Sequence, residues 1–258
     1  MSALAALPGS VPQLPVLGRR SVVDRATHVG ARENNEDYVL TDEAGSAAII
    51  VVADGVGGEP WGEHASRLAC VSAISFTRRA LRAAELRGQA PVTRRIVQLA
   101  FRLAYRSLRR EARQSRRVAG LKTTLILAVA ERATLTFGHV GDGGLWLGHC
   151  DGSPLEALLN PMRWSPGGEL TSALGPTRRT EPIIGVRTLP ERAIVVAATD
   201  GLADPIPAPS WQFIAAELVR GDDMQIVMQQ LLEHCAGMRE EGQPVFTDNM
   251  TLAAIRRA

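Results

Sequence analysis

Three apolar runs, each bordered by an aspartate, constrain the fold of this chain more than any other feature of its sequence. They are Ala47–Ala53 before Asp54, Ile194–Ala198 before Asp200, and Met250–Ile255 after Asp248. Such short, β-branched runs bounded by glycine or polar residues are typical of buried strands. A fourth acidic segment is Asn35-Glu36-Asp37. Carboxylates gathered at the ends of buried strands are costly unless a cation neutralises them, so the pattern predicts a cluster of divalent metal ions in an enzyme.

Size and composition narrow the class of protein. At 258 residues with 45% apolar content, the chain can bury one large core, and the absence of repeats and low-complexity linkers favours one domain over residues 21–258. The net charge of +2 gives no reason to expect a nucleic acid or a membrane as partner. No stretch approaches the roughly 18 to 20 apolar residues of a membrane span.

The N-terminal segment and the cysteines suggest a cytoplasmic protein. Pro8, Pro12 and Pro15 would interrupt the core of a signal peptide, and no basic residue precedes the apolar part. We therefore expect residues 1–20 to form a disordered or loosely docked tail. Three widely spaced cysteines within apolar stretches favour buried, reduced thiols over disulfides or a zinc site. These are Cys70, Cys150 and Cys235.

The periodicity of apolar residues predicts the order of the elements. Strands are expected over 22–23, 38–40, 47–53, 123–129, 134–140, 145–147, 183–189, 194–198 and 250–255. Helices are expected over 63–86, from Pro91 to about Ser115, over 210–219 and over 223–238. Strands alternating with helical pairs in this order predict two antiparallel sheets packed together, with helices outside.

The second predicted helix combines an apolar stripe with many arginines. The stripe has i, i+3, i+4 spacing, which predicts one buried face, and consists of Ile96, Leu99, Ala100, Leu103 and Leu108. The basic residues between them are Arg94, Arg95, Arg102, Arg106, Arg109, Arg110 and Arg113. Such residues usually form a solvated helix face, and a role in docking a partner is the alternative.

Five short motifs in a fixed order resemble a known family. They are Arg32-Glu33-Asn34-Asn35-Glu36-Asp37, Asp54-Gly55-Val56-Gly57-Gly58, Gly138-His139-Val140-Gly141-Asp142, Thr199-Asp200-Gly201-Leu202 and Asp248-Asn249. Together they resemble the signature series of the PPM-type metal-dependent serine/threonine phosphatases, the 2C group, in their bacterial form. The resemblance spans about Val22 to Ile255. It implies an α/β (α+β) fold, an αββα sandwich of two antiparallel sheets flanked by helical pairs, with a metal centre at one end.

The resemblance also implies how the metals are held. Asp54 would bridge two ions, and the carbonyl of Gly55 would ligate one of them. Asp200 and Asp248 would hold the other ion, with Glu36 acting directly or through water. Hard oxygen ligands without nearby histidine or cysteine favour Mg²⁺ or Mn²⁺. Two such ions, ~3.5–4 Å apart, lower the pKa of a shared water, so a phosphoester can be hydrolysed without a covalent intermediate.

Three further residues receive roles from the resemblance. Asp37 would fix metal-bound waters from behind the ligands. Arg32 would clamp the phosphate, because its guanidinium is a planar bidentate donor. Asp142 would help Asp200 to bind a third ion, although a tight turn at Gly141-Asp142-Gly143 would explain it nearly as well.

The chain also departs from the family pattern. Gly143-Gly144 stands where Ser-Arg is usual, Lys122 where a glycine precedes two threonines, and Val56 where eukaryotic relatives have a histidine. His64, on the following helix, is a less suitable proton donor. Residues 160–168 form a shortened flap before Leu170–Gly175, which predicts recognition through a larger surface of a protein substrate.

These observations predict hydrolysis of phosphoserine and phosphothreonine esters on proteins, with two or three Mn²⁺ or Mg²⁺ ions. The resemblance implies a cognate serine/threonine kinase pathway as the functional partner. One alternative is a phosphatase acting on an anti-sigma-factor antagonist or a similar switch protein. Another is a catalytically silent phosphatase fold that serves as a regulatory binding module.

Overall fold

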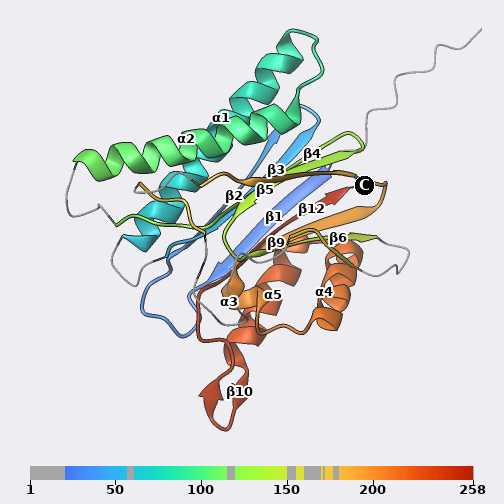
Figure 1. Cartoon of the computed structure of the whole chain (residues 1–258). Helices are drawn as coiled ribbons and strands as arrows, with labels where there is room; N and C mark the ends of the chain where they lie inside the picture. Colours follow the sequence, from blue (N-terminus) through green and yellow to red (C-terminus); the bar gives the residue numbers. More distant parts are fainter. Residues whose placement is uncertain are drawn as a thin grey trace, which may run out of the picture.

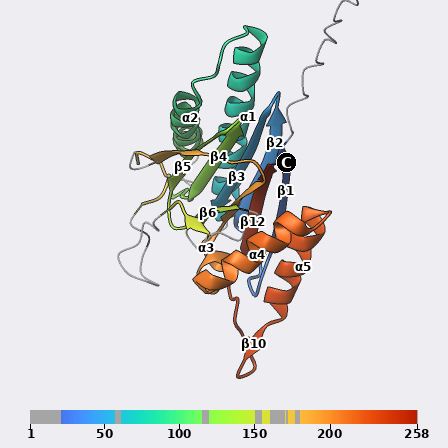
Figure 2. The same cartoon turned by 90° about the vertical axis from the view of Figure 1, so that its right-hand side faces the viewer.

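Two five-stranded antiparallel sheets pack face to face, and a pair of helices covers the outer face of each sheet (Figure 1). The computed structural model describes residues 21–56, 61–114, 120–149, 155–159, 170, 172–176 and 180–257. Figure 2 shows the two helical pairs on opposite sides of the sheets. The αββα sandwich expected from the sequence is therefore confirmed.

The first sheet has the strand order β2-β3-β4-β5-β8. Its strands are β2 (Asp37–Ala44), β3 (Ala47–Asp54), β4 (Leu125–Glu131), β5 (Thr134–Val140) and β8 (Ile183–Thr188). The helices that cover it are α1 (Gly62–Leu86) and α2 (Thr93–Gln114). They share one apolar core with the outer face of this sheet.

The second sheet has the strand order β1-β12-β9-β6-β7. Its strands are β1 (Ser21–His28), β12 (Met250–Arg257), β9 (Ala193–Ala198), β6 (Gly144–His149) and β7 (Glu156–Ala157). The helices on its outer side are α4 (Ala208–Arg220) and α5 (Met224–Gly237). A short helix, α3 (Asp200–Ala203), follows β9, and a small hairpin joins β10 (Arg239–Glu240) to β11 (Gln243–Pro244).

Burial of both faces explains why the central strands are continuous apolar runs in the sequence. In β3, Ile49 and Val51 face the helices, whereas Ile50 and Val52 face the other sheet. The same alternation holds in β9, where Val195 belongs to the core between the sheets. With both faces covered, a strand needs no polar residue at every second position.

The predicted buried stripe of α2 is partly wrong. Ile96, Ala100 and Leu108 are buried, but Leu99 and Leu103 are only half-buried. Val97 and Phe101 take their place, together with Ala104. A Cβ on Gly138 of β5 would lie 2.7 Å from the Phe101 ring and 2.9 Å from a Val97 methyl group. The helix is thus rotated so that these two side chains pack over a glycine in the sheet.

Smaller differences lie at element ends. The second helix begins at Thr93, two residues after Pro91, and α3, β7 and the β10–β11 hairpin are too short to give a periodic signal.

Cys70 and Cys235 are buried free thiols. None of the helices in the described ranges combines the length and apolar character that a membrane span requires. The tail 1–20, Cys150, Gly57, Gly58 and the shortened flap at 160–168 lie outside the described residues.

Candidate metal centre

The predicted acidic residues gather at one end of the two sheets. Asp37 begins β2 and Asp54 ends β3, and the two are register partners. Asp142 lies in the turn between β5 and β6, Asp200 is the first residue of α3 after β9, and Asp248 lies two residues before β12. Neighbouring strands are antiparallel, so these strand ends meet at the same edge.

Three of these carboxylates form a compact group. Asp54, Asp142 and Asp200 each offer an oxygen, and the three oxygens lie within 4.8 Å of one another. Burial raises the pKa of Asp54 well above its usual value, and the charges of Asp37, Asp200, Asp248 and Asp142 raise it further. An all-oxygen donor set of three neighbouring carboxylates fits a hard divalent cation such as Mg²⁺ or Mn²⁺.

Asp37 is buried beside this group. The Thr199 hydroxyl donates a hydrogen bond to Asp37 Oδ2 over 2.8 Å. Burial raises the pKa of Asp37 to about 6, although hydrogen bonds from Thr199 and Thr251 oppose the shift. Asp37 is therefore held by Thr199, the residue after β9, and by Thr251 of β12, which fixes its position beside the Asp54 carboxylate.

Two threonines just before β4 hold the backbone of Asp54. The Asp54 N–H donates to Thr124 Oγ1 over 2.9 Å, and the Thr123 hydroxyl donates to the Asp54 carbonyl over 2.8 Å. The residue after Asp54 must be small, because a Cβ on Gly55 would lie 2.3 Å from the carbonyl carbon of Gly62. Gly55 thus allows the start of α1 to lie directly against the acidic edge.

Glu36 lies next to the same helix end. A Cβ on Gly62, the first residue of α1, would be 2.7 Å from the Glu36 carboxyl carbon. The positive end of a helix dipole favours a carboxylate at this place. Burial raises the pKa of Glu36, Arg32 lowers it, and Asp248 raises it. Glu36 therefore belongs with Arg32 and Asp248 on the rim of the group formed by Asp54, Asp142 and Asp200.

Arg32 and Asp248 form an ion pair on this rim. Arg32 Nη2 lies 2.7 Å from Asp248 Oδ2, and the two side chains are 55% and 41% exposed. The half-exposed guanidinium is open to a ligand from solvent. The pair also orients one carboxylate oxygen of Asp248, while the other accepts the Asn249 N–H over 2.8 Å.

Asn249 organises the loop that carries Arg32 and Glu36, and we did not predict this role from the sequence. Its Oδ1 accepts the Glu36 N–H over 2.8 Å, and its Nδ2 donates to the carbonyls of Val29 and Asn34 over 2.8 and 2.9 Å. The side chain is buried. The Asp-Asn dipeptide drew attention to this position, but which groups the amide binds depends on the tertiary contact.

Packing explains the Gly143-Gly144 departure. A Cβ on Gly144 would lie 2.0 Å from the Trp146 ring, and a Cβ on Gly143 would lie 2.8 Å from the carbonyl oxygen of Ala198. Trp146 itself stacks on Trp211 at a centroid distance of 4.0 Å. The two glycines therefore accommodate neighbouring groups, and the adjacent acidic side chain remains in the cluster.

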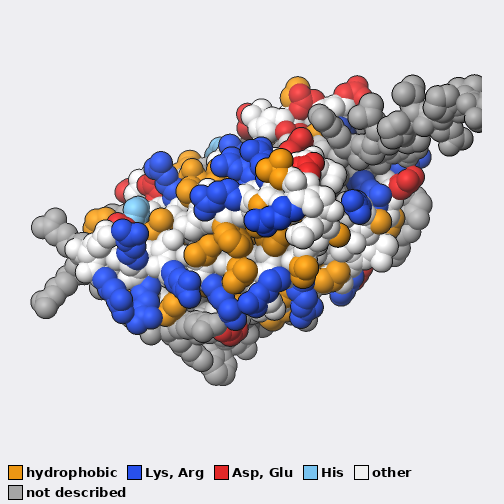
Figure 3. Space-filling model, turned by 90° about the horizontal axis from the view of Figure 1, so that it is seen from above, with side chains coloured by type: hydrophobic (Ala, Val, Ile, Leu, Met, Phe, Trp, Pro, Cys, Tyr) orange, Lys and Arg blue, Asp and Glu red, His pale blue; other side chains and the backbone are white. Residues whose placement is uncertain are grey.

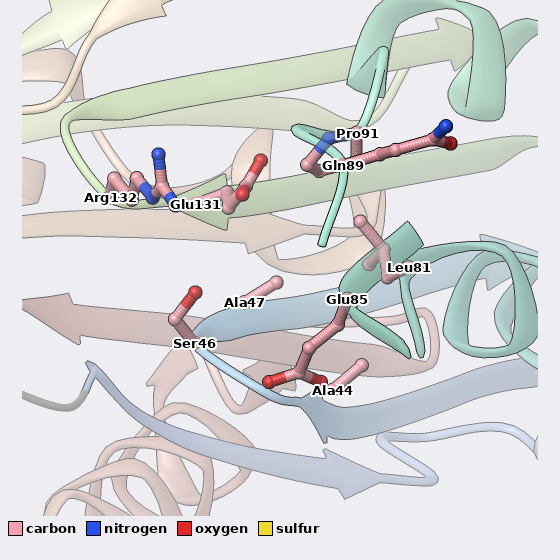
Figure 4. Close-up of a pocket in the computed structure, with 9 residues that line it drawn as sticks. All are labelled: Ala44, Ser46, Ala47, Leu81, Glu85, Gln89, Pro91, Glu131 and Arg132. Atoms are coloured by element: carbon pink, nitrogen blue, oxygen red, sulfur yellow. The ribbon is translucent and has the colours of Figure 1, made fainter. Parts of the chain in front are cut away.

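Two other features are not part of the acidic cluster. His64 Nε2 lies 3.3 Å from Glu111 Oε1, which links the start of α1 to the end of α2. A pocket of about 110 Å³ lies at the β2–β3 turn, the opposite end of β3 from Asp54 (Figure 4). It is lined by Ala44, Ser46, Ala47, Leu81, Glu85, Gln89, Pro91, Glu131 and Arg132. The acidic edge is thus separate from this cavity.

Comparison with known proteins identifies the family. The family described as protein phosphatase 2C matches residues 26–236, most of the chain. A sequence search of curated proteins gives no match. This chain belongs to the protein phosphatase 2C family.

Solved structures show the same fold at low sequence identity. The serine/threonine phosphatase PstP/Ppp of Mycobacterium tuberculosis is 20% identical, with a TM-score of 0.74 over 92% of this chain and 98% of that chain. PppA of Pseudomonas aeruginosa, described as a regulatory component of its T6SS, is 22% identical, with a TM-score of 0.71 over 92% and 97%. A PstP catalytic domain in complex with two manganese ions is 20% identical, with a TM-score of 0.71 over 92% and 97%.

Proposed function

We propose that this protein hydrolyses phosphoserine and phosphothreonine esters on protein substrates at a divalent-metal centre. The observation that carries the proposal is the convergence of Asp54, Asp142 and Asp200 within 4.8 Å, in a chain of the protein phosphatase 2C family. A buried carboxylate group of this kind has a clear use when it binds metal and an energetic cost when it does not.

The positions of the acids support an assignment of metal ligands. We assign two Mn²⁺ or Mg²⁺ ions to Asp54, Asp200, Asp248, the Gly55 carbonyl and Glu36. Asp142, with Asp200, provides for a third ion. When bound, such ions act as Lewis acids and lower the pKa of water for attack on phosphorus. Manganese in the PstP structure supports this choice of metals.

The remaining residues of the site bind and orient. The exposed guanidinium of Arg32 is placed to receive the phosphate oxygens as a bidentate donor. Asp37, fixed by the Thr199 hydroxyl, would hold metal-bound water from behind the ligands as a hydrogen-bond acceptor. Asn249 holds the loop that positions Arg32 and Glu36 relative to Asp248.

The acidic residues favour an enzyme over a silent binding module. A protein without a catalytic centre gains nothing from Asp54, whose pKa is raised by burial and by four neighbouring carboxylates.

The family implies a phosphoprotein substrate, and we propose that a serine/threonine kinase in the same cell produces it. The free thiols of Cys70 and Cys235 suit action in the reducing cytoplasm.

A direct assay tests the proposal. The protein is incubated with p-nitrophenyl phosphate in Mn²⁺, in Mg²⁺ and in EDTA, beside the isosteric variant Asp54→Asn. We expect metal-dependent release of p-nitrophenol by the parent protein only. Absence of any metal-dependent turnover in a folded parent protein would refute the phosphatase assignment. Turnover retained in Asp54→Asn would refute the role given to Asp54.

A further inference from the structure

Positive charge is concentrated on the α1–α2 layer. These two helices contain eleven arginines and three glutamates, whereas the whole chain has a net charge of only +2. The arginines are Arg67, Arg78, Arg79 and Arg82 in α1, and Arg94, Arg95, Arg102, Arg106, Arg109, Arg110 and Arg113 in α2. The rest of the chain is therefore net negative.

Five of the α2 arginines form one continuous stripe. At 100° per residue, they fall within about 60° of one another around the helix, opposite the buried face. The stripe residues are Arg95, Arg102, Arg106, Arg109 and Arg113. It extends along roughly 27 Å of helix, the span of about eight residues of extended polypeptide. Figure 3 looks down on this layer and shows blue basic side chains in rows beside an apolar strip.

The stripe is not neutralised within the described part of the chain. Arg78 of α1 pairs with Asp42 over 3.1 Å, but none of the seven α2 arginines forms an ion pair there. Arg102 and Arg106, and likewise Arg109 and Arg113, are i, i+4 pairs of like charge, an arrangement that destabilises a helix. An external anionic partner would remove this repulsion.

One end of the stripe lies at the metal-centre end of the sandwich. The two helices are antiparallel, since Ser72 donates a hydrogen bond to Ser107 and His64 pairs with Glu111. Gly62, at the start of α1, lies against Glu36 of the acidic edge. The C-terminal part of α2, with Arg109 and Arg113, is therefore the part of the stripe nearest the centre.

We propose that the arginine stripe of α2 docks an acidic tract of the phosphoprotein substrate, whose phosphorylated residue then reaches the metal centre. The inference rests on the proposed phosphatase function, because it assigns the substrate class of that same site. Charge complementarity and the position of one stripe end at the metal-centre end of the sandwich favour a polypeptide that spans both. The tract matched to the stripe is about eight residues of Asp and Glu.

Paired phosphothreonine peptides test the docking surface. One carries an eight-residue tract of Asp and Glu, before or after the phosphothreonine, and the other carries Ser and Gly instead. In low salt we expect kcat/KM to be roughly tenfold higher for the acidic peptide, since several exposed ion pairs together contribute about that factor. The difference should largely vanish in about 0.5 M NaCl, where exposed charges are screened.

Matched charge reversals localise the effect. Arg106→Glu/Arg109→Glu changes two exposed stripe residues, and Arg220→Glu/Arg239→Glu makes the same charge change on α4 and β10. We expect only the stripe variant to lose the preference for the acidic peptide, with turnover of p-nitrophenyl phosphate unchanged in both. Circular dichroism confirms that both variants are folded.

Three outcomes would overturn the inference. They are equal use of the two peptides by the parent protein, loss of the preference in the control variant as well, and stripe-dependent binding only to phosphatidylserine vesicles or single-stranded DNA. If the parent protein shows no phosphatase activity, fluorescence anisotropy with the acidic peptide still tests docking. Stripe-dependent binding would then support the surface, while the proposed function alone fails.

Discussion

Replacing Asn249 with alanine should damage the site without touching an acidic residue. The substitution removes three hydrogen bonds of a buried side chain, at 2.8, 2.8 and 2.9 Å. At about 1 kcal/mol net for each bond, the expected loss in the free energy of unfolding is roughly 3 kcal/mol. In a protein of this size, that loss lowers the melting temperature by about 6 to 12 °C.

The functional loss should come from the loop that carries Arg32 and Glu36. Once the Glu36 N–H and the carbonyls of Val29 and Asn34 are released, this loop is no longer held against the start of β12. We expect Mn²⁺ affinity to fall by about 10- to 100-fold, the usual cost of removing a group that positions metal ligands. Isothermal titration calorimetry on the folded variant measures this directly.

Asn35→Ala is the matched control, because Asn35 lies in the same loop but its amide bonds only to the Thr27 hydroxyl, near the surface, and to a neighbouring backbone N–H. Its expected cost is about 1 kcal/mol or less. If urea unfolding gives Asn249→Ala the same stability as Asn35→Ala, the amide does not hold the loop. Unchanged Mn²⁺ affinity in Asn249→Ala would show that the loop is positioned by other contacts.

Three further predictions concern the same edge. Burial raises the pKa of Asp37 from 3.8 to about 6, so the folded state binds more protons than the unfolded state between these values, and this stabilisation is lost as pH rises through 6. Urea unfolding in EDTA should therefore show a free energy of unfolding about 1 kcal/mol lower at pH 7.5 than at pH 5, and Asp37→Asn should lack this difference. Gly62→Ala should cost little stability, because the Glu36 carboxyl that its Cβ meets is the end of a flexible side chain, but by displacing that carboxyl it should weaken Mn²⁺ binding in calorimetry, whereas Gly237→Ala in α5, with no atom within 4 Å of the new Cβ, should leave Mn²⁺ binding unchanged. Asp142→Asn should slow p-nitrophenyl phosphate turnover while calorimetry still shows two Mn²⁺ bound, and an unchanged rate would indicate that Asp142 serves only the turn.

The central strands and their acidic ends could be predicted from the sequence for a physical reason. A strand covered on both faces, such as Ala47–Asp54, must be apolar throughout, so its first polar residue marks the edge of the core. In an antiparallel sandwich, such edges coincide in space. This is why Asp54 and Asp200 could be expected together from their strands alone, whereas Asp142 was placed with them only by the family resemblance.

The rotation of α2 could not be predicted in this way. Apolar spacing alone allows Leu99 and Leu103 on the buried face as readily as Val97 and Phe101. The choice depends on Gly138, more than thirty residues later, which leaves room in the sheet for the Phe101 ring. The roles of Asn249 and Gly143 likewise depend on contacts with distant segments, whereas Gly144 makes room for Trp146 two residues later.

The charge distribution links the stability of the fold to its proposed activity. The acidic edge concentrates carboxylates whose pKa values are raised by burial, so in the absence of a cation it opposes folding at neutral pH. The α1–α2 layer concentrates like charges of the opposite sign. Arg32 pairs with Asp248 of the edge, but the described arginines of the α2 stripe form no ion pair with it. The two clusters have opposite charge but, among the described residues, form no ion pair with each other. We therefore expect separate external ligands, metal ions for the edge and an acidic polypeptide for the stripe. Adding Mn²⁺ should therefore raise the stability of the parent protein and of Arg106→Glu/Arg109→Glu equally, because ligand binding stabilises the folded state only through its own site.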